Sequence, residues 1–148
     1  LLLQEVRAYA PDYFLSADSD ILLHEKLLVN LMETLAEHPW AAVAGRCYLT
    51  PPPSSLVLNA GKLSGSNSLR RVHRDTLGPL KVDLIMALKF MTPAAYNVDY
   101  VSNFHGEDIG WSIRCREAGL DLGFDGRVAS KHVMDEHWLT TVDPRVGW

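Results

Sequence analysis

The apolar positions of this chain change their spacing several times, and each spacing predicts a helix or a strand. Over residues 24–38 the apolar side chains recur every three to four positions, as on one face of a helix, and Pro39 follows its end. Short apolar runs at 13–17 and 41–44 predict buried strands on either side of this helix. Further helices are expected at 1–9 and 107–118, and further strands at 82–91, 122–124 and 127–130. This order predicts an α/β fold in which helices flank a mixed sheet.

One segment, 50–78, departs from these patterns. It contains three consecutive prolines, several serines and glycines, and the basic residues Arg70, Arg71 and Arg74. A long stretch of this composition predicts an irregular, mobile loop. Its arginines could contact the phosphates of a ligand or simply remain solvated.

Bulk properties exclude some classes of protein. The 148 residues suit one domain, and a net charge of -4 argues against a surface built for nucleic acid. No apolar run reaches the roughly 20 residues of a transmembrane helix. The two cysteines form no CxxC pair and suggest neither a disulfide framework nor a zinc site, which favours a reducing, cytoplasmic setting.

Two acidic residues, Asp18 and Asp20, follow the strand expected at 13–17. Ligands of α/β sheets bind at the carboxyl ends of strands, and two carboxylates one residue apart can share a hard divalent cation. Asp and Ser at such positions also fit a turn that leads into the next helix. The pattern alone leaves both interpretations open.

A second acidic pair, Glu107 and Asp108, opens the helix expected at 107–118. Carboxylates in a first helical turn are favoured by the helix dipole, so capping is one interpretation. The other is a general base that takes a proton from an attacking hydroxyl. His132 follows the last expected strand, and a neutral imidazole can ligate a metal that carboxylates already hold.

Together these motifs resemble the GT-A-fold glycosyltransferases, most closely those of family 2. Residues 13–21 are similar to that family's DxD strand, 82–87 to its middle segment, 106–112 with 116–120 to its ED-motif helix, and 130–134 to its closing metal-ligand segment. The resemblance implies a single partial catalytic domain over 1–148 that is truncated at the N-terminus. Only 17 residues precede Asp18, where the family has a nucleotide-binding strand–helix–strand unit.

The resemblance also implies a reaction, the inverting transfer of a sugar from a nucleotide-diphosphate donor to an acceptor hydroxyl with Mn²⁺ or Mg²⁺. Asp20 and His132 would be direct metal ligands, and Asp18 would contact the donor ribose or the metal shell. Asp108 would be the base, and Glu107 would help to place the acceptor. Asp108→Asn is then expected to abolish transfer without preventing folding, because Asn keeps the shape and can still cap a helix.

Two other functions fit the same residues. In a haloacid-dehalogenase-like phosphatase Asp18 would be the nucleophile and Asp20 the acid/base, although the Gly-Thr usual after that motif is replaced by Ile21-Leu22-Leu23. A non-catalytic sugar- or nucleotide-binding remnant would keep the fold and the binding without turnover.

Overall fold

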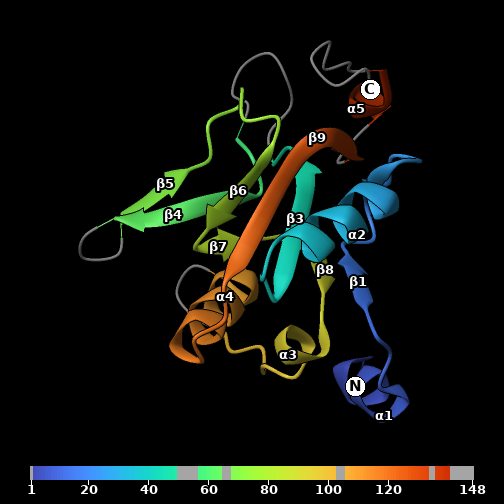
Figure 1. Ribbon diagram of the computed structural model, residues 1–148. Coiled ribbons are helices and arrows are strands. Elements are labelled where there is room, and N and C mark those ends of the chain that lie inside the picture. The colour runs from blue at the N-terminus through green and yellow to red at the C-terminus, as the bar shows by residue number, and fades with distance from the viewer. Residues whose placement is uncertain (1, 50–56, 65–67, 103–105, 134–135, 141–148) are drawn as a thin grey trace.

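The protein folds around a mixed sheet, seen in a computed structural model that describes residues 2–49, 57–64, 68–102, 106–133 and 136–140 (Figure 1). The sheet contains, in spatial order, β1 (Phe14–Ala17), β8 (Leu88–Met91), β3 (Ala42–Cys47), β9 (Leu122–His132) and β2 (Ile21–Leu22), and β6 (Pro79–Val82) also pairs with β9. Strands β3 and β9 are parallel, whereas the other pairs are antiparallel. The expected α/β fold with a mixed sheet is confirmed.

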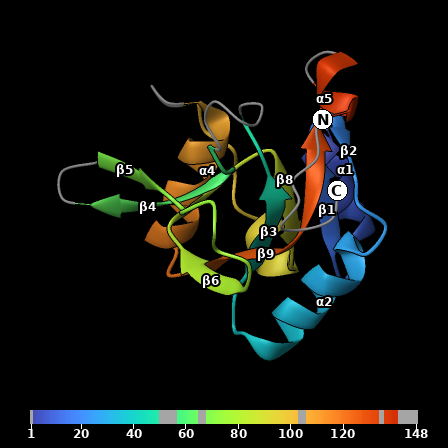
Figure 2. The same ribbon diagram turned by 90° about the horizontal axis from the view of Figure 1, so that it is seen from above.

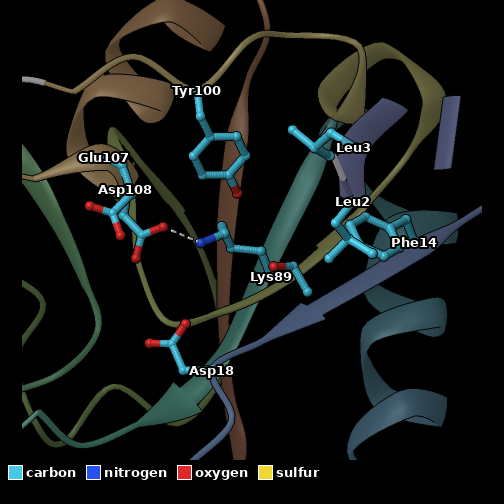
Figure 3. A pocket seen from close by; sticks show the side chains of 9 residues that line it. Leu2, Leu3, Phe14, Asp18, Lys89, Tyr100, Glu107 and Asp108 are labelled. Atoms are coloured by element: carbon cyan, nitrogen blue, oxygen red, sulfur yellow. Dashed lines mark hydrogen bonds and ion pairs between the residues drawn. The ribbon is translucent and has the colours of Figure 1, made fainter. Parts of the chain in front are cut away.

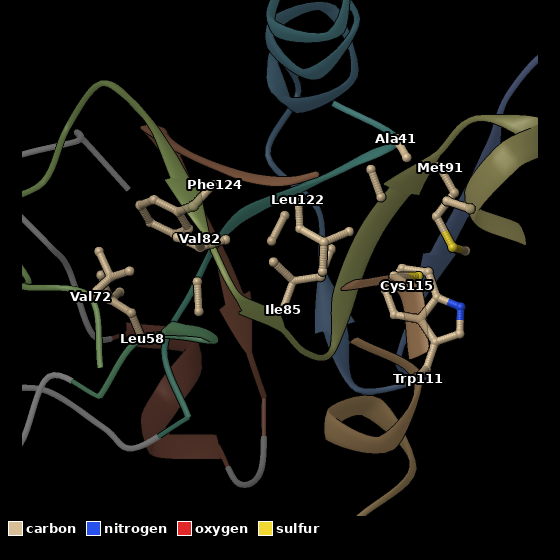
Figure 4. Close-up of a cluster of buried hydrophobic side chains, with 14 of the residues drawn as sticks. Ala41, Leu58, Val72, Val82, Ile85, Met91, Trp111, Cys115, Leu122 and Phe124 are labelled. Carbon is tan, nitrogen blue, oxygen red and sulfur yellow. The ribbon is translucent and has the colours of Figure 1, made fainter. Parts of the chain in front are cut away.

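Helices cover both faces of this sheet, with α2 (Leu27–Glu37) and α4 (Glu107–Glu117) on opposite sides (Figure 2). Alternate residues of β3 point to the two faces, as a strand requires. Val43 packs with Leu27 and Leu31 of α2, while Ala42 and Ala44 belong to the cluster around Trp111 of α4, which Figure 4 shows. The core therefore has two layers of apolar side chains, one on each face of the sheet.

The other elements lie around this core. They are α1 (Leu2–Tyr9), α3 (Pro93–Tyr96), α5 (Glu136–Thr140) and a second sheet in which β4 (Ala60–Ser64) pairs with both β5 (Ser68–Arg71) and β7 (Leu84–Ile85). Strands β4 and β5 form a hairpin that projects from the body of the molecule (Figure 1). No helix in the described ranges is long and apolar enough to cross a membrane.

The prediction of an irregular loop over 50–78 is wrong for the residues of β4 and β5; residues 50–56 and 65–67 lie outside the described chain. The buried side chain of Asn59 explains much of this order. Its amide donates to the carbonyls of Gly45 and Met86, and its carbonyl accepts from the N–H of Cys47. These partners are distant in sequence, so composition does not reveal them. Mobility of the segment stays a prediction.

The boundaries of several strands differ from those expected from the sequence. The single strand expected at 82–91 is divided into the end of β6, β7 and β8, and the strands expected at 122–124 and 127–130 form one continuous β9. In α2 the apolar face is only partly buried, since Leu28 and Met32 are nearly half exposed. Both Cys47 and Cys115 are buried and free, as small core residues would be.

Candidate functional site

Strand pairing brings the end of β9 next to the first acidic motif. Residues 18–20 connect β1 to β2, and β2 pairs with the end of β9 so that Ile21 lies opposite His132. The Asp20 Oδ2 atom is consequently 3.1 Å from the His132 Nε2 atom. The N–H of Val133 donates to the Asp20 carbonyl at 2.7 Å, which fixes the backbone of the same pair. Two of the expected metal ligands, 112 positions apart, are thus in contact.

Glu107 and Asp108 of the second acidic motif line a cleft of about 410 Å³ together with Asp18 of the first, whereas Asp20 and His132 are not among the described residues that line it. Asp18, Glu107 and Asp108 provide carboxylates, and Lys89 lies among them (Figure 3). The remaining lining is mostly apolar or aromatic and comes from Leu2, Leu3, Phe14, Ser16 and Tyr100. A ligand here would meet carboxylates on one side and apolar side chains on the other.

Ala87, between β7 and β8, links the two acidic motifs through its backbone. Its N–H donates to Asp108 Oδ2 at 2.9 Å, and its carbonyl accepts from the N–H of Asp18 at 3.0 Å. Its φ is +59°, and the N–H of Leu88 bonds to the carbonyl of Met86 across it, as in a γ-turn. A non-glycine residue at positive φ is strained, and such strain persists where surrounding contacts require it. The same residue therefore contacts both acidic residues, through the two peptide groups on either side of its Cα.

Lys89 is the residue of the cleft that the sequence analysis missed. Its side chain is only 2% exposed, and its ammonium forms an ion pair with Asp108 Oδ1. The Lys89 Nζ atom also lies 5.5 Å from the centre of the Tyr100 ring and 5.9 Å from that of Trp111. The available signal was a lysine in the middle of an apolar run, on the face of β8 opposite to that of Leu88 and Phe90.

The cleft changes the proton affinity of two groups that line it. Partial burial and the nearby charge of Asp108 raise the pKa of Asp18, and the ammonium of Lys89 acts in the opposite direction. Burial, followed by the charge of Asp108, also raises the pKa of Tyr100, so its hydroxyl stays protonated at neutral pH. Asp18 and Tyr100 therefore both respond to the charge of Asp108.

Asp108 does not act as a helix cap in this structure. The N-cap of α4 is Gly106, at a φ of +100° and without a side-chain capping bond. The carboxylate of Asp108 instead bonds to Ala87 and Lys89, both outside the helix. Glu107 is exposed and lines the same cleft.

The three arginines that could contact a ligand, Arg70, Arg71 and Arg74, differ in their burial and contacts. Arg71 is half-buried, and its guanidinium donates to Met86 Sδ at 3.2 Å, one residue before Ala87. Burial lowers the pKa of this guanidinium. Arg70 is exposed, and Arg74 lies 3.9 Å from the carboxylate of Asp75.

No ready-made metal cluster is present in the part of the chain that the structure describes, since no three His, Cys, Asp or Glu side chains are grouped to hold an ion. That Asp18 completes a three-ligand site with Asp20 and His132 stays a prediction. The Asp20 side chain is 42% exposed and that of His132 is 12% exposed, so the pair is open to solvent on the Asp20 side.

Comparison with known proteins relates the chain to others by its fold and not by its sequence. No family model matches the chain, and no curated protein matches it. The fold is similar to that of the crystal structure of A197 from STIV, with a TM-score of 0.63 and 14% sequence identity. The similarity covers 90% of this chain, which spans only 64% of the length of A197. At this identity the likeness shows the fold alone.

Proposed function

We propose that this chain is part of a GT-A-like glycosyltransferase that moves a sugar from a nucleotide-diphosphate donor to an acceptor hydroxyl. One observation carries the proposal: Asp18, after β1, lines one cleft with both acidic residues of α4, and His132 contacts Asp20, two residues after Asp18. A cleft with carboxylates at strand and helix ends suits chemistry on a polar, metal-bound substrate. The similarity of sequence motifs described above supports the same reaction.

Asp20 and His132 fit a partial metal site. Ions such as Mg²⁺ commonly take one or two protein carboxylates and complete their shell with substrate phosphates and water, and Mn²⁺ also accepts imidazole. A bound Mn²⁺ or Mg²⁺ would neutralise the charge that develops on the leaving nucleoside diphosphate. Asp18, two residues before Asp20 and part of the cleft lining, would contact the donor ribose or the water shell of the ion.

Asp108 is suited to accept the proton of an acceptor hydroxyl. Each carboxylate oxygen offers two lone pairs, and the contacts with Lys89 and Ala87 occupy one on each oxygen. Its side chain is 24% exposed, so a hydroxyl in the cleft can reach the remaining lone pairs. Glu107, the adjacent residue at the cleft, would hydrogen-bond other hydroxyls of the acceptor.

The test is release of nucleoside diphosphate from a panel of UDP- and GDP-sugars with Mn²⁺, with and without added sugar acceptors. We expect metal-dependent release that is lost in Asp20→Asn and His132→Ala. The matched control is Asp121→Asn, which changes a carboxylate with a 44% exposed side chain that pairs with Lys81 and is not among the described residues that line the cleft.

Two other outcomes would each replace the proposal. Saturable binding of nucleotide sugar without release from any donor would indicate a non-catalytic binding protein. Hydrolysis of p-nitrophenyl phosphate that is lost in Asp18→Asn would indicate a phosphatase instead.

A further inference from the structure

The charges that line the cleft are unequal in number. Asp18, Glu107 and Asp108 provide three carboxylates, and Lys89 is the one lysine or arginine among the described residues that line it. Carboxylate oxygens are the preferred ligands of hard divalent cations, so a cleft with three of them attracts such ions. The position of the Lys89 ammonium therefore determines which of these carboxylates a divalent cation can approach.

The structure holds the Lys89 ammonium in one place. Its backbone lies in β8 between Ser16 of β1 and Ala44 of β3, so it is paired on both sides. A buried ammonium is costly unless it is paired, and here Asp108 supplies the opposite charge while Tyr100 and Trp111 present their ring faces. These contacts hold the ammonium at one position in the lining of the cleft.

We propose that Lys89 is the internal counter-ion of the cleft, which occupies Asp108 in place of a metal ion and leaves the Asp20–His132 pair, outside the cleft lining, as the place where a divalent cation binds. The location of that metal site rests on the proposed function, whereas the exclusion of a metal from Asp108 follows from the ion pair itself. A divalent cation that approached Asp108 would meet the charge of the ammonium at short range, where repulsion is strong.

This arrangement has a consequence for the chemistry of Asp108. A metal ion bound to Asp108 would coordinate the oxygens that a substrate hydroxyl needs. The ammonium of Lys89 takes a single position on Oδ1, so that, with the Ala87 N–H on Oδ2, one lone pair of each oxygen is left for a hydroxyl. Lys89 is a positioning and selectivity residue in this account, because it acts through Asp108 and not on the substrate.

The experiment is a titration with Mn²⁺ alone, in which free ion is measured by electron paramagnetic resonance, on the wild type, Lys89→Met, Lys89→Arg and the double variant Lys89→Met/Asp108→Asn. We expect Lys89→Met to bind one Mn²⁺ ion more than the wild type. Lys89→Arg keeps the positive charge and should match the wild type. The double variant should lose the additional ion, because it lacks the Asp108 charge.

Equal Mn²⁺ stoichiometry in folded Lys89→Met and wild type would overturn the proposal. Lys89→Gln, which is neutral but polar, provides the same test if Lys89→Met does not give the circular dichroism spectrum of a folded protein. The comparison is a difference between variants. A wild type that binds no Mn²⁺ would therefore contradict the proposed Asp20–His132 metal site, while the additional ion in Lys89→Met would still support the role of Lys89.

Discussion

Replacing Asp108 by Asn should destabilise the protein substantially, contrary to the expectation from helix capping, because it leaves the buried ammonium of Lys89 without its counter-charge. The Asn carbonyl can accept from either the Ala87 N–H or the Lys89 ammonium, and its NH₂ group then faces the other donor. Lys89 is 2% exposed, so water cannot replace the lost partner. Removing one member of a buried ion pair costs about 3–5 kcal/mol. For a domain of this size that corresponds to a fall in Tm of roughly 6–20 °C.

Urea unfolding in the presence of EDTA measures this cost on the wild type, Asp108→Asn, Lys89→Met and the double variant. Lys89→Met should lose less stability than Asp108→Asn, because the partly exposed carboxylate of Asp108 keeps its bond to Ala87 and gains water. The double variant should be more stable than Asp108→Asn alone, since no unpaired ammonium remains. The reasoning is refuted if Asp108→Asn unfolds within about 0.5 kcal/mol of the wild type, or if the two single costs add in the double variant.

Two further predictions concern the core. Gly123→Ala should lower the free energy of unfolding in urea by about 1–3 kcal/mol, because a Cβ there would lie 1.8 Å from the Trp40 ring. The control, Gly78→Ala, has nothing within 4 Å of its Cβ and should change this free energy by less than about 0.5 kcal/mol. Equal losses of stability in the two variants would contradict the packing of Gly123 against Trp40. Burial raises the pKa of both Cys47 and Cys115 from 9.0 to about 12, so neither thiol should react readily with Ellman's reagent near pH 8 in the native state, and both should react in concentrated guanidinium. Rapid labelling of the native protein near pH 8 would contradict the burial of these thiols. Because their folded-state pKa values are raised, the stability that the protonated thiols contribute is present below pH 9.0 and is lost as the pH rises toward about 12.

Local spacing of apolar residues was enough to predict β1, β3, β8 and β9 of the sheet and its covering helices, whereas β2 and most of β6 were missed. The helix expected at 24–38 is α2, the strand at 13–17 is β1, and the helix at 107–118 is α4, each within a few residues. The β4–β5 hairpin was missed, because its order depends on contacts such as those of Asn59 with Gly45 and Met86. Contacts of that kind join distant segments and leave no periodic pattern.

The acidic motifs and His132 could be identified from sequence because each follows a strand or opens a helix, where ligands bind. Lys89 could not, because a lysine within an apolar run is compatible with an edge strand, a solvated face or a buried ion pair. Only the pairing of β8 between β1 and β3, together with the position of α4, places its ammonium on Asp108. The strained turn at Ala87 depends on the same tertiary contacts.

The most direct test of the account is anomalous diffraction from crystals of the protein grown with Mn²⁺ and either UDP or GDP. The account predicts one Mn²⁺ peak at about 2.0–2.6 Å from both the Asp20 carboxylate and the His132 imidazole, with the diphosphate on the same ion. Asp108 should still be paired with Lys89 in that complex. A nucleotide bound in the cleft without Mn²⁺ at Asp20 and His132, or with the ion on Asp108, would contradict it.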